Sequence, residues 1–315
     1  MTEDVGTRDC VLVVNPQSGN GNHIETIREL AAEHGFEVAV SESGDHAVSL
    51  AREAAESGAT RIGACGGDGT INQVVRGIDA ADAFDEVTFG VVPAGTGNNF
   101  AGNVGVESIE HGIELLAEGE TRTIDLGTAG DELFVNSCIC GLTANASGET
   151  SSDLKDRFGP LAYVFKTIET MTEFEAIPLH VHAEDEGALW DGDAVFVLIG
   201  NARSFPAGGD GQGDAEDGLL EVTIVEDVPT NQLLRDATVS HLLGGETASI
   251  SRLRTPSLTV DVRREEPVSF SFDGEMASFQ SLSCRVRPRT LSVRVGEGYR
   301  TESDADADDA ESKSV

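Results

Sequence analysis

The stretch RIGACGGDGTINQVV, from Arg61 to Val75, joins an apolar run, three glycines and the start of a helical pattern. The run RIGAC predicts a buried strand, and the apolar periodicity from about Thr70 onward predicts a helix. The glycines between them allow the backbone to approach a bound group closely, as an anion site at a strand–helix junction requires. A strand, a glycine-rich loop and a helix in this order form the repeating unit of a parallel sheet.

The same unit recurs on both sides of this stretch. Further predicted strands are VLVVN (11–15), FEVAVS (36–41) and FGVVP (89–93). Further predicted helices run to about residue 34, over about 45–56 and near 107–117. This alternation favours an α/β fold in which ligands bind beyond the carboxyl ends of parallel strands. Polar, glycine-rich loops follow three of those ends, at residues 15–22, 66–70 and 95–99.

The pattern changes at about residue 121, where short strand-like runs take over. These runs are TRTIDLG, ELFVNSCICG, LHVHAE, AVFVLIGN, LLEVTIVED, LTVDV, VSFSFDGE, SLSCRVRP and LSVRVG. Helical stretches near 153–174 and 231–243 interrupt them. Such runs are typical of an antiparallel sandwich or barrel. We therefore expect an α/β nucleotide-binding domain over 1–124, a mostly antiparallel β-sandwich domain over 125–298 whose last strands could return to the first domain, and an acidic disordered tail over 299–315.

The charge balance is strongly acidic. Lys and Arg number 21 and Asp and Glu number 56, so the formal net charge is −35. This excludes binding of nucleic acid through a general basic surface, which places clustered Lys and Arg against phosphates. At about 1 M salt the Debye length falls to about 3 Å, which screens the self-repulsion of such a chain. With its scarce Lys and aromatic residues, the chain is expected in a very salty cytosol. An acidic protein of an ordinary cell is the alternative.

Segments that would place the chain in a membrane or outside the cell are missing from the sequence pattern. No apolar run approaches the roughly 18 residues of a membrane span, and the acidic start MTEDVGTRD is not a secretory signal. We therefore expect a cytoplasmic protein. Its five cysteines are then expected to be reduced thiols, and Cys138-x-Cys140 and His180-x-His182 to be strand residues rather than metal ligands.

Taken together, in order and spacing, the three glycine-rich loops resemble those of the diacylglycerol kinase catalytic-domain family of lipid kinases, which is related to sphingosine and ceramide kinases. The matching segments are NPQSG (15–19), GGDGTINQV (66–74) and PAGTGNNFA (93–101). Later matches are LKDRFGPLAY (154–163), GNARSFPAGG (200–209), DAEDGLLEV (214–222) and FDGE (272–275). The resemblance covers about residues 11–298 and implies an NAD kinase-like α/β domain followed by a β-sandwich.

The resemblance implies that the glycine-rich loops bind ATP. Carried over residue by residue, the nucleotide contacts fall on Ser41, Gly66, Gly67, Asp68, Gly69, Thr70, Asn72 and Thr96. Asn15, Ser18 and Lys155 are expected to help place phosphate. A carboxylate at Asp68 is tolerable beside phosphates if it binds a metal, a ribose hydroxyl or the loop's own amides. Capping of the following helix is the alternative role of Thr70.

In the family, the catalytic base is the aspartate of the D-G-E motif, which corresponds to Asp273 here. The role is chemically reasonable, because the proton of an acceptor alcohol must leave as the γ-phosphoryl arrives. Asp-Gly also predicts a hairpin turn, and a base at a turn between two strands agrees with both interpretations.

The segment DAEDGL resembles the family's structural magnesium site. The resemblance implies that Asp217 supplies a carboxylate to Mg²⁺ and that Asp214 and Leu219 supply backbone carbonyls, which suits an oxygen-binding cation. A plain turn at Asp217-Gly218 is the alternative. A second Mg²⁺ is expected to arrive with ATP.

The expected function is therefore ATP-dependent transfer of the γ-phosphoryl group to a hydroxyl of a membrane lipid, either diacylglycerol-like or an isoprenoid glycerol ether. Such an enzyme would be peripheral to the membrane, and a free strand edge would allow a homodimer. Asn99 and Gly102 stand where the family often has an acidic and a basic residue. An NAD kinase-like enzyme and a non-catalytic nucleotide or lipid sensor are the alternatives.

Overall fold

The computed structural model describes residues 9–19, 23–95, 98–141, 176–183, 189–202, 213–227 and 250–301. The chain divides into two compact units, one made of residues 1–124 and 289–315 and the other of residues 125–288. The predicted helices near 153–174 and 231–243, together with Thr96, Lys155 and the acidic tail from residue 302 onward, lie outside the described residues. Within the described part, no helix is long and apolar enough to cross a membrane.

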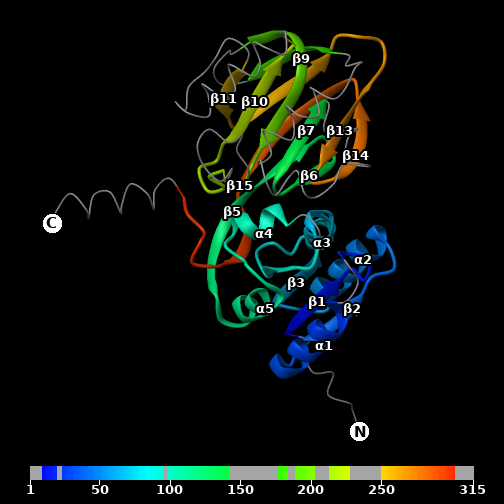
Figure 1. Ribbon diagram of the computed structural model, residues 1–315, viewed down its shortest axis with the longest axis vertical. Coiled ribbons are helices and arrows are strands. Elements are labelled where there is room, and N and C mark those ends of the chain that lie inside the picture. The colour runs from blue at the N-terminus through cyan, green and yellow to red at the C-terminus, as the bar shows by residue number, and fades with distance from the viewer. Residues whose placement is uncertain are drawn as a thin grey trace, which may run out of the picture. The chain divides into compact units, whose positions relative to one another are not determined.

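The first unit is a parallel sheet flanked by helices (Figure 1). Its strands pair in parallel in the order β4-β3-β1-β2. The strands are β1 (Cys10–Val14), β2 (Glu37–Val40), β3 (Arg61–Gly66) and β4 (Thr88–Pro93). The helices are α1 (His23–His34), α2 (Gly44–Glu56), α3 (Asp68–Ala80), α4 (Asn99–Asn103) and α5 (Ile109–Glu118). The α/β prediction for this part of the chain is confirmed.

Every residue of β1 is buried, as expected for a central strand of a sheet that is covered on both faces. Serine side chains cap the N-termini of two of the helices. Ser43 accepts a hydrogen bond from the backbone N–H of His46 at the start of α2, and Ser108 accepts one from His111 at the start of α5. Such caps contribute about 1 kcal/mol each, and they fix the residue at which each helix begins.

The last of the described strands also contributes to the first unit. Strand β15 (Ser281–Val295) pairs in parallel with β4 at Val293 and Phe89. The backbone N–H of Gly296 then donates to the carbonyl of Val104 at 2.9 Å. The described chain continues to Tyr299 and Thr301, both of which are buried. The predicted runs SLSCRVRP and LSVRVG thus form one strand instead of two.

The second unit is a mostly antiparallel β structure, as predicted. Its path runs β14-β13-β7-β9-β8-β12-β15, and β10 pairs with β9 and β11. The strands are β5 (Glu120–Ala129), β6 (Glu132–Phe134), β7 (Ser137–Gly141), β8 (Ile177–Ala183), β9 (Leu189–Gly200), β10 (Leu220–Glu226), β11 (Ile250–Thr255), β12 (Ser257–Val262), β13 (Val268–Phe272) and β14 (Glu275–Phe279). The run ELFVNSCICG, predicted as one strand, is divided between β6 and β7.

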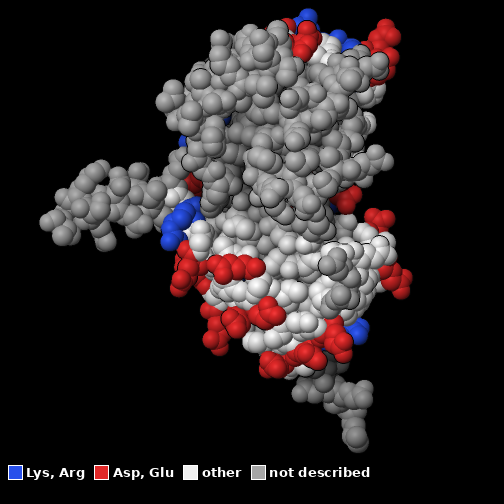
Figure 2. Space-filling view, viewed as in Figure 1, with Lys and Arg blue, Asp and Glu red and all other residues white. Residues whose placement is uncertain are grey.

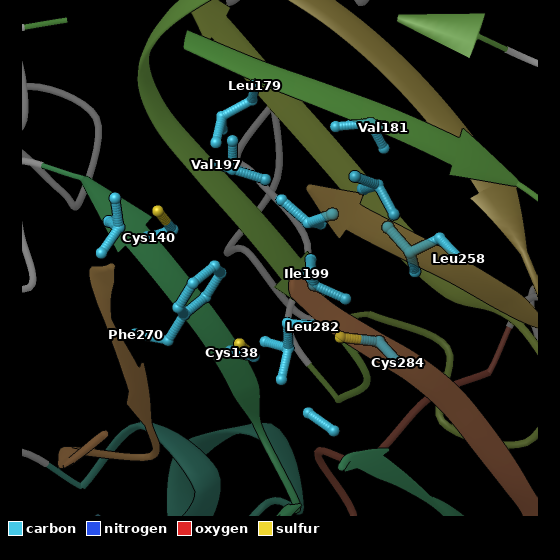
Figure 3. Packing of buried hydrophobic residues seen from close by; sticks show 14 of the residues in the cluster. Cys138, Cys140, Leu179, Val181, Val197, Ile199, Leu258, Phe270, Leu282 and Cys284 are labelled. Carbon is cyan, nitrogen blue, oxygen red and sulfur yellow. The ribbon is translucent and has the colours of Figure 1, made fainter. Parts of the chain in front are cut away.

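The interior of the second unit is built from alternating apolar residues of these strands. Figure 3 shows Cys138 and Cys140 on β7 together with Phe270, Leu282 and Cys284 in this cluster. All five cysteines of the chain are buried and free. Burial raises the pKa of the Cys140 thiol to about 12, so these cysteines act as small apolar core residues.

Candidate active site

The three glycine-rich loops of the first unit meet beyond the carboxyl ends of its strands. The side-chain amide of Asn15 donates from Nδ2 to Oγ1 of Thr70 at 3.1 Å, which joins the first loop to the second. A Cβ atom added to Gly95 would lie 2.5 Å from Cα of Gly67. The second and third loops therefore pack backbone against backbone, and only glycine at position 95 permits that approach.

Gly19 makes a similar approach from the first loop. A Cβ atom there would lie 2.6 Å from the carbonyl oxygen of Ala94, and the φ of Gly19 is +55°, a conformation that favours glycine. The turn before it is organised by Asn15, which accepts the backbone N–H of Gln17 on Oδ1 and that of Ser18 on its carbonyl. The predicted residues Asn15 and Ser18 thus shape the first loop.

The carboxylate of Asp68 binds backbone and side-chain amides of the third loop. It accepts the N–H of Asn99 at 3.2 Å, the Nδ2 group of Asn99 at 2.8 Å and the N–H of Phe100 at 3.0 Å. These donors lie at the first turn of α4, where a carboxylate is stabilised by the free N–H groups of the helix. The roles considered for Asp68 included binding to amides of its own loop, whereas the amides that it binds belong to the third loop.

Three of the predicted nucleotide residues are buried, one directly after β2 and two in the first turns of α3. Ser41 donates from Oγ to the carbonyl of Val14 at 3.2 Å, and Asn72 is 1% exposed. Thr70 is also buried, and its Oγ1 would lie 2.4 Å from a Cβ atom on Gly66. The alternative role of Thr70 as a helix cap is wrong, because Gly67 occupies the cap position and α3 begins at Asp68.

In the second unit, Asp273 lies at the tip of the hairpin between β13 and β14. Its φ is +51° and that of Gly274 is +107°, as a two-residue turn of this kind requires. Its carboxylate accepts the backbone N–H groups of Val135 at 2.7 Å, Asn136 at 3.0 Å and Ser137 at 2.8 Å. These amides hold the carboxylate in one orientation and compensate its charge.

Two further carboxylates, those of Asp214 and Asp217, lie within the loop between residues 214 and 219. Asp214 accepts the N–H of Glu216 at 2.9 Å, and Asp217 accepts the N–H of Leu219 at 2.7 Å. Burial raises the pKa of Asp217, while hydrogen bonds from Leu219 and Arg254 oppose that shift. Asp217 also forms an ion pair with Arg254. In the structure, the guanidinium group of Arg254 balances the charge of this half-buried carboxylate.

Two polar residues that the sequence analysis did not single out connect these groups. Asp125 is fully buried, and its Oδ2 accepts the N–H of Gly218 at 2.7 Å. Asn201, at the end of β9, donates from Nδ2 to the carbonyls of Asp125 and Val135, both at 2.8 Å. An aspartate between Ile124 and Leu126, inside the strand-like run TRTIDLG, was the available signal for Asp125. Asn201 lies in the matching segment GNARSFPAGG (200–209), but that segment gives no sign of its partners Asp125 and Val135.

Comparisons with known proteins cover both units. Residues 9–129 match the family model of the diacylglycerol kinase catalytic domain, and residues 136–295 match that of the YegS C-terminal NAD kinase beta sandwich-like domain. The chain is 33% identical over 262 residues to a "Probable lipid kinase YegS-like" of Pseudomonas putida, covering 82% of this chain and 84% of that protein. It is 29% identical over 294 residues to a "Probable lipid kinase YegS" of Escherichia coli, covering 90% and 95%.

Solved structures extend the likeness to the fold. A crystal structure of a diacylglycerol kinase from Bacillus anthracis matches with a TM-score of 0.68 at 17% identity, covering 93% of this chain and 98% of that one. At this identity the likeness concerns the fold alone. It spans the parallel sheet as well as the antiparallel strands.

Proposed function

The chain belongs to the family of the diacylglycerol kinase catalytic domain and is a lipid kinase, and on that premise we propose that it transfers the γ-phosphoryl group of ATP to a hydroxyl of a membrane lipid. The acceptor is a diacylglycerol-like lipid or an isoprenoid glycerol ether. The observation that carries the proposal is the carboxylate of Asp273, which three backbone amides hold at the tip of a hairpin.

The glycine-rich loops of the first unit are the proposed ATP site. Gly66, Gly67 and Gly69 lie at the junction of β3 and α3, where free backbone N–H groups and the helix dipole favour phosphate. The hydrogen bond from Asn15 to Thr70 and the contact between Gly95 and Gly67 support the proposal, because they fix three loops at one end of the sheet. In this arrangement Asp68 acts on the third loop instead of on phosphate.

Asp273 is the proposed catalytic base. Its carboxylate accepts the proton of the lipid hydroxyl while the hydroxyl oxygen attacks the γ-phosphorus atom and the bond to the β-phosphate oxygen breaks. The N–H groups of Val135, Asn136 and Ser137 orient the carboxylate before the alcohol arrives. Positioning of this kind supplies much of the catalysis in phosphoryl transfer, where the protein does little covalent chemistry.

The loop from Asp214 to Leu219 is the proposed structural Mg²⁺ site. The donors fit in type, since Mg²⁺ prefers carboxylate and carbonyl oxygens, and the burial that raises the pKa of Asp217 creates a need for positive charge. Asp217 would supply its carboxylate and Asp214 and Leu219 their backbone carbonyls, with Arg254 as a competing partner of Asp217. Mg²⁺ supplies charge neutralisation when it is bound.

A phosphotransfer assay tests the proposal. Labelled ATP and Mg²⁺ are offered in molar KCl with diacylglycerol, isoprenoid glycerol ethers, long-chain bases, polyprenols and NAD as acceptors. We expect label in a product that extracts into organic solvent, and we expect the variant Asp273→Asn to lose at least about 100-fold in turnover. Asp261→Asn, a matched change in the same unit, should leave turnover unchanged.

Other outcomes would overturn parts of the proposal. Label in NADP, or no label in any lipid, contradicts transfer to a membrane lipid. Turnover of Asp273→Asn close to that of the unaltered enzyme removes Asp273 from the role of base while leaving the lipid kinase in place.

A further inference from the structure

Asn201 is a buried hub of the second unit. It follows the last residue of β9 and is 1% exposed. Both hydrogens of its side-chain amide are used, because Nδ2 donates to the carbonyl oxygens of Asp125 and Val135 at 2.8 Å each. Its backbone N–H donates to the carbonyl of Asn136 at 2.9 Å. One residue therefore fixes two segments that lie 76 and 66 positions away in the sequence.

The orientation of this amide is determined by its acceptors. A flipped side chain would place Oδ1 against two carbonyl oxygens, which repel it. In the observed orientation Oδ1 is buried, and it has no hydrogen-bond partner among the residues that the structure describes. A buried acceptor in that condition costs about 1–3 kcal/mol. Asn201 therefore joins two segments through its two donors at the cost of one buried acceptor without a described partner.

The two residues whose carbonyls Asn201 binds each contact a different part of the candidate site: Val135 contacts Asp273, and Asp125 contacts the 214–219 loop. Val135 is one of the three residues whose N–H groups bind the carboxylate of Asp273. Its N–H donates to Oδ2 of Asp273 at 2.7 Å. The backbone N–H of Asp125 donates to the carbonyl of Ala215 at 2.6 Å, and its carboxylate accepts the N–H of Gly218. Asn201 thus lies between the segment that orients Asp273 and the residue that orients the 214–219 loop.

We propose that Asn201 is a positioning residue for phosphoryl transfer: through the carbonyls of Val135 and Asp125, its amide sets the placement of the Asp273 carboxylate relative to the 214–219 loop. The inference rests on the proposed role of Asp273 as the base. It assigns no contact between Asn201 and substrate. Removal of the amide frees the peptide segment that presents the three N–H groups, so the carboxylate loses its fixed position while the loops of the first unit are unaffected.

The test compares Asn201→Ala with a core variant that lowers stability and changes no residue that contacts Asp273 or the 214–219 loop. Val260→Ala serves as that control, because Val260 is fully buried in β12 and apolar. Turnover, the KM for ATP and thermal unfolding are measured for the full chain with diacylglycerol and isoprenoid glycerol ethers in detergent micelles. Asn201→Ser, which keeps one donor, replaces Asn201→Ala if the alanine variant does not fold.

We expect Asn201→Ala to lower kcat at least about tenfold, since small misplacements of a catalytic group are costly, and to leave the KM for ATP within about twofold. Val260→Ala should keep its kcat despite a similar fall in Tm. In the Asp273→Asn background the Asn201 substitution should change the residual turnover less than about threefold, because two residues that act through one group are not additive.

Two results would overturn the inference. One is a kcat of Asn201→Ala within about twofold of the unaltered enzyme, and the other is an equal loss of kcat in Val260→Ala. Asp273→Asn, assayed in parallel, separates this failure from that of the proposed function. An inactive Asp273→Asn beside a fully active Asn201→Ala contradicts only the role of Asn201, whereas an active Asp273→Asn removes the base itself.

Discussion

Asp68 accepts the backbone N–H of Phe100 at 3.0 Å, although 32 residues separate the two in sequence. The same carboxylate binds the backbone and side-chain amides of Asn99. The second glycine-rich loop therefore holds the third one in place through a single charged group. Hydrogen bonds to a charged group are among the stronger ones in proteins, at about 1.5–3 kcal/mol, so this carboxylate is central to the shape of the proposed ATP site.

Asp68→Asn should weaken nucleotide binding and lower the stability of the first unit. The new amide group has fewer acceptor sites than the carboxylate, and its own N–H would face the donors of Asn99 and Phe100. We expect the Kd for ATP to rise about tenfold, which corresponds to about 1.4 kcal/mol, together with a lower Tm. Calorimetric titration with ATP measures this change. Asp85→Asn, the same substitution at an exposed position, should change neither quantity.

Gly95, in the PAGTGNNFA segment, and Gly102, directly after that segment, should respond in opposite directions to alanine. At Gly95 the added Cβ would lie 2.5 Å from Cα of Gly67, so the second and third loops must separate and we expect loss of ATP binding with a cost of about 1–3 kcal/mol. At Gly102, inside α4, nothing lies within 4 Å of that atom, and alanine should stabilise the helix by about 0.5–1 kcal/mol. Denaturant unfolding measures the change in stability, and titration with ATP measures the change in binding. Equal effects at the two positions would contradict the close approach of Gly95 to Gly67.

Asp273→Asn should lower stability as well as turnover. Its carboxylate uses one oxygen for Val135 and the other for Asn136 and Ser137, so an amide nitrogen in place of either oxygen meets a donor instead of an acceptor. We expect a cost of about 1–3 kcal/mol in the free energy of unfolding. The left-handed backbone at this position is tolerated by asparagine and adds no further strain. An unchanged midpoint of denaturant unfolding would show that these three hydrogen bonds are weak.

The proposed structural cation predicts a ligand-dependent stability. Added Mg²⁺ should raise the Tm of the unaltered protein by mass action, and EDTA should remove the gain. Asp217→Asn should show no such rise, because the carboxylate that would bind the ion is lost. Asp261→Asn keeps the site and should respond as the unaltered protein does. A Mg²⁺-dependent rise of equal size in Asp217→Asn would place the ion elsewhere.

Salt should stabilise the folded chain. Figure 2 shows acidic side chains spread over the described surface of the first unit, and the net charge of the chain is −35. Raising KCl from about 0.1 M to about 2 M shortens the Debye length from about 10 Å to a few ångströms and screens this repulsion. We expect Tm and turnover to rise over that range. Full stability and activity at the lower concentration would contradict adaptation to a salty cytosol.

The elements that could be predicted are those that depend on residues close together in the sequence. Strands β1 and β3 are apolar runs that stop at Pro16 or at the glycines after Cys65, and such signals need no information from distant residues. The short helix α4 was missed because its stabilising carboxylate, Asp68, comes from 31 residues earlier. Local periodicity cannot indicate a contact of that range.

The same limit applies to the candidate site. Asp273 follows from a motif of three residues, yet the division of ELFVNSCICG into two strands depends on Asp273 itself. The N–H groups of Val135 and Asn136 bind its carboxylate, so these residues form a turn between β6 and β7 instead of a continuous strand. Asn201 and Asp125 are likewise defined by partners far away in the chain.

The pairing of Val293 with Phe89 also bears on how the chain is made. Strand β4 is synthesised about 200 residues before the strand that covers its edge. At about 5–20 residues per second the ribosome needs about 10–40 seconds to supply that strand. During this interval the nascent first unit carries an open sheet edge, which invites pairing with other chains. The first unit is therefore completed only after residues 125–288 of the second unit have been synthesised.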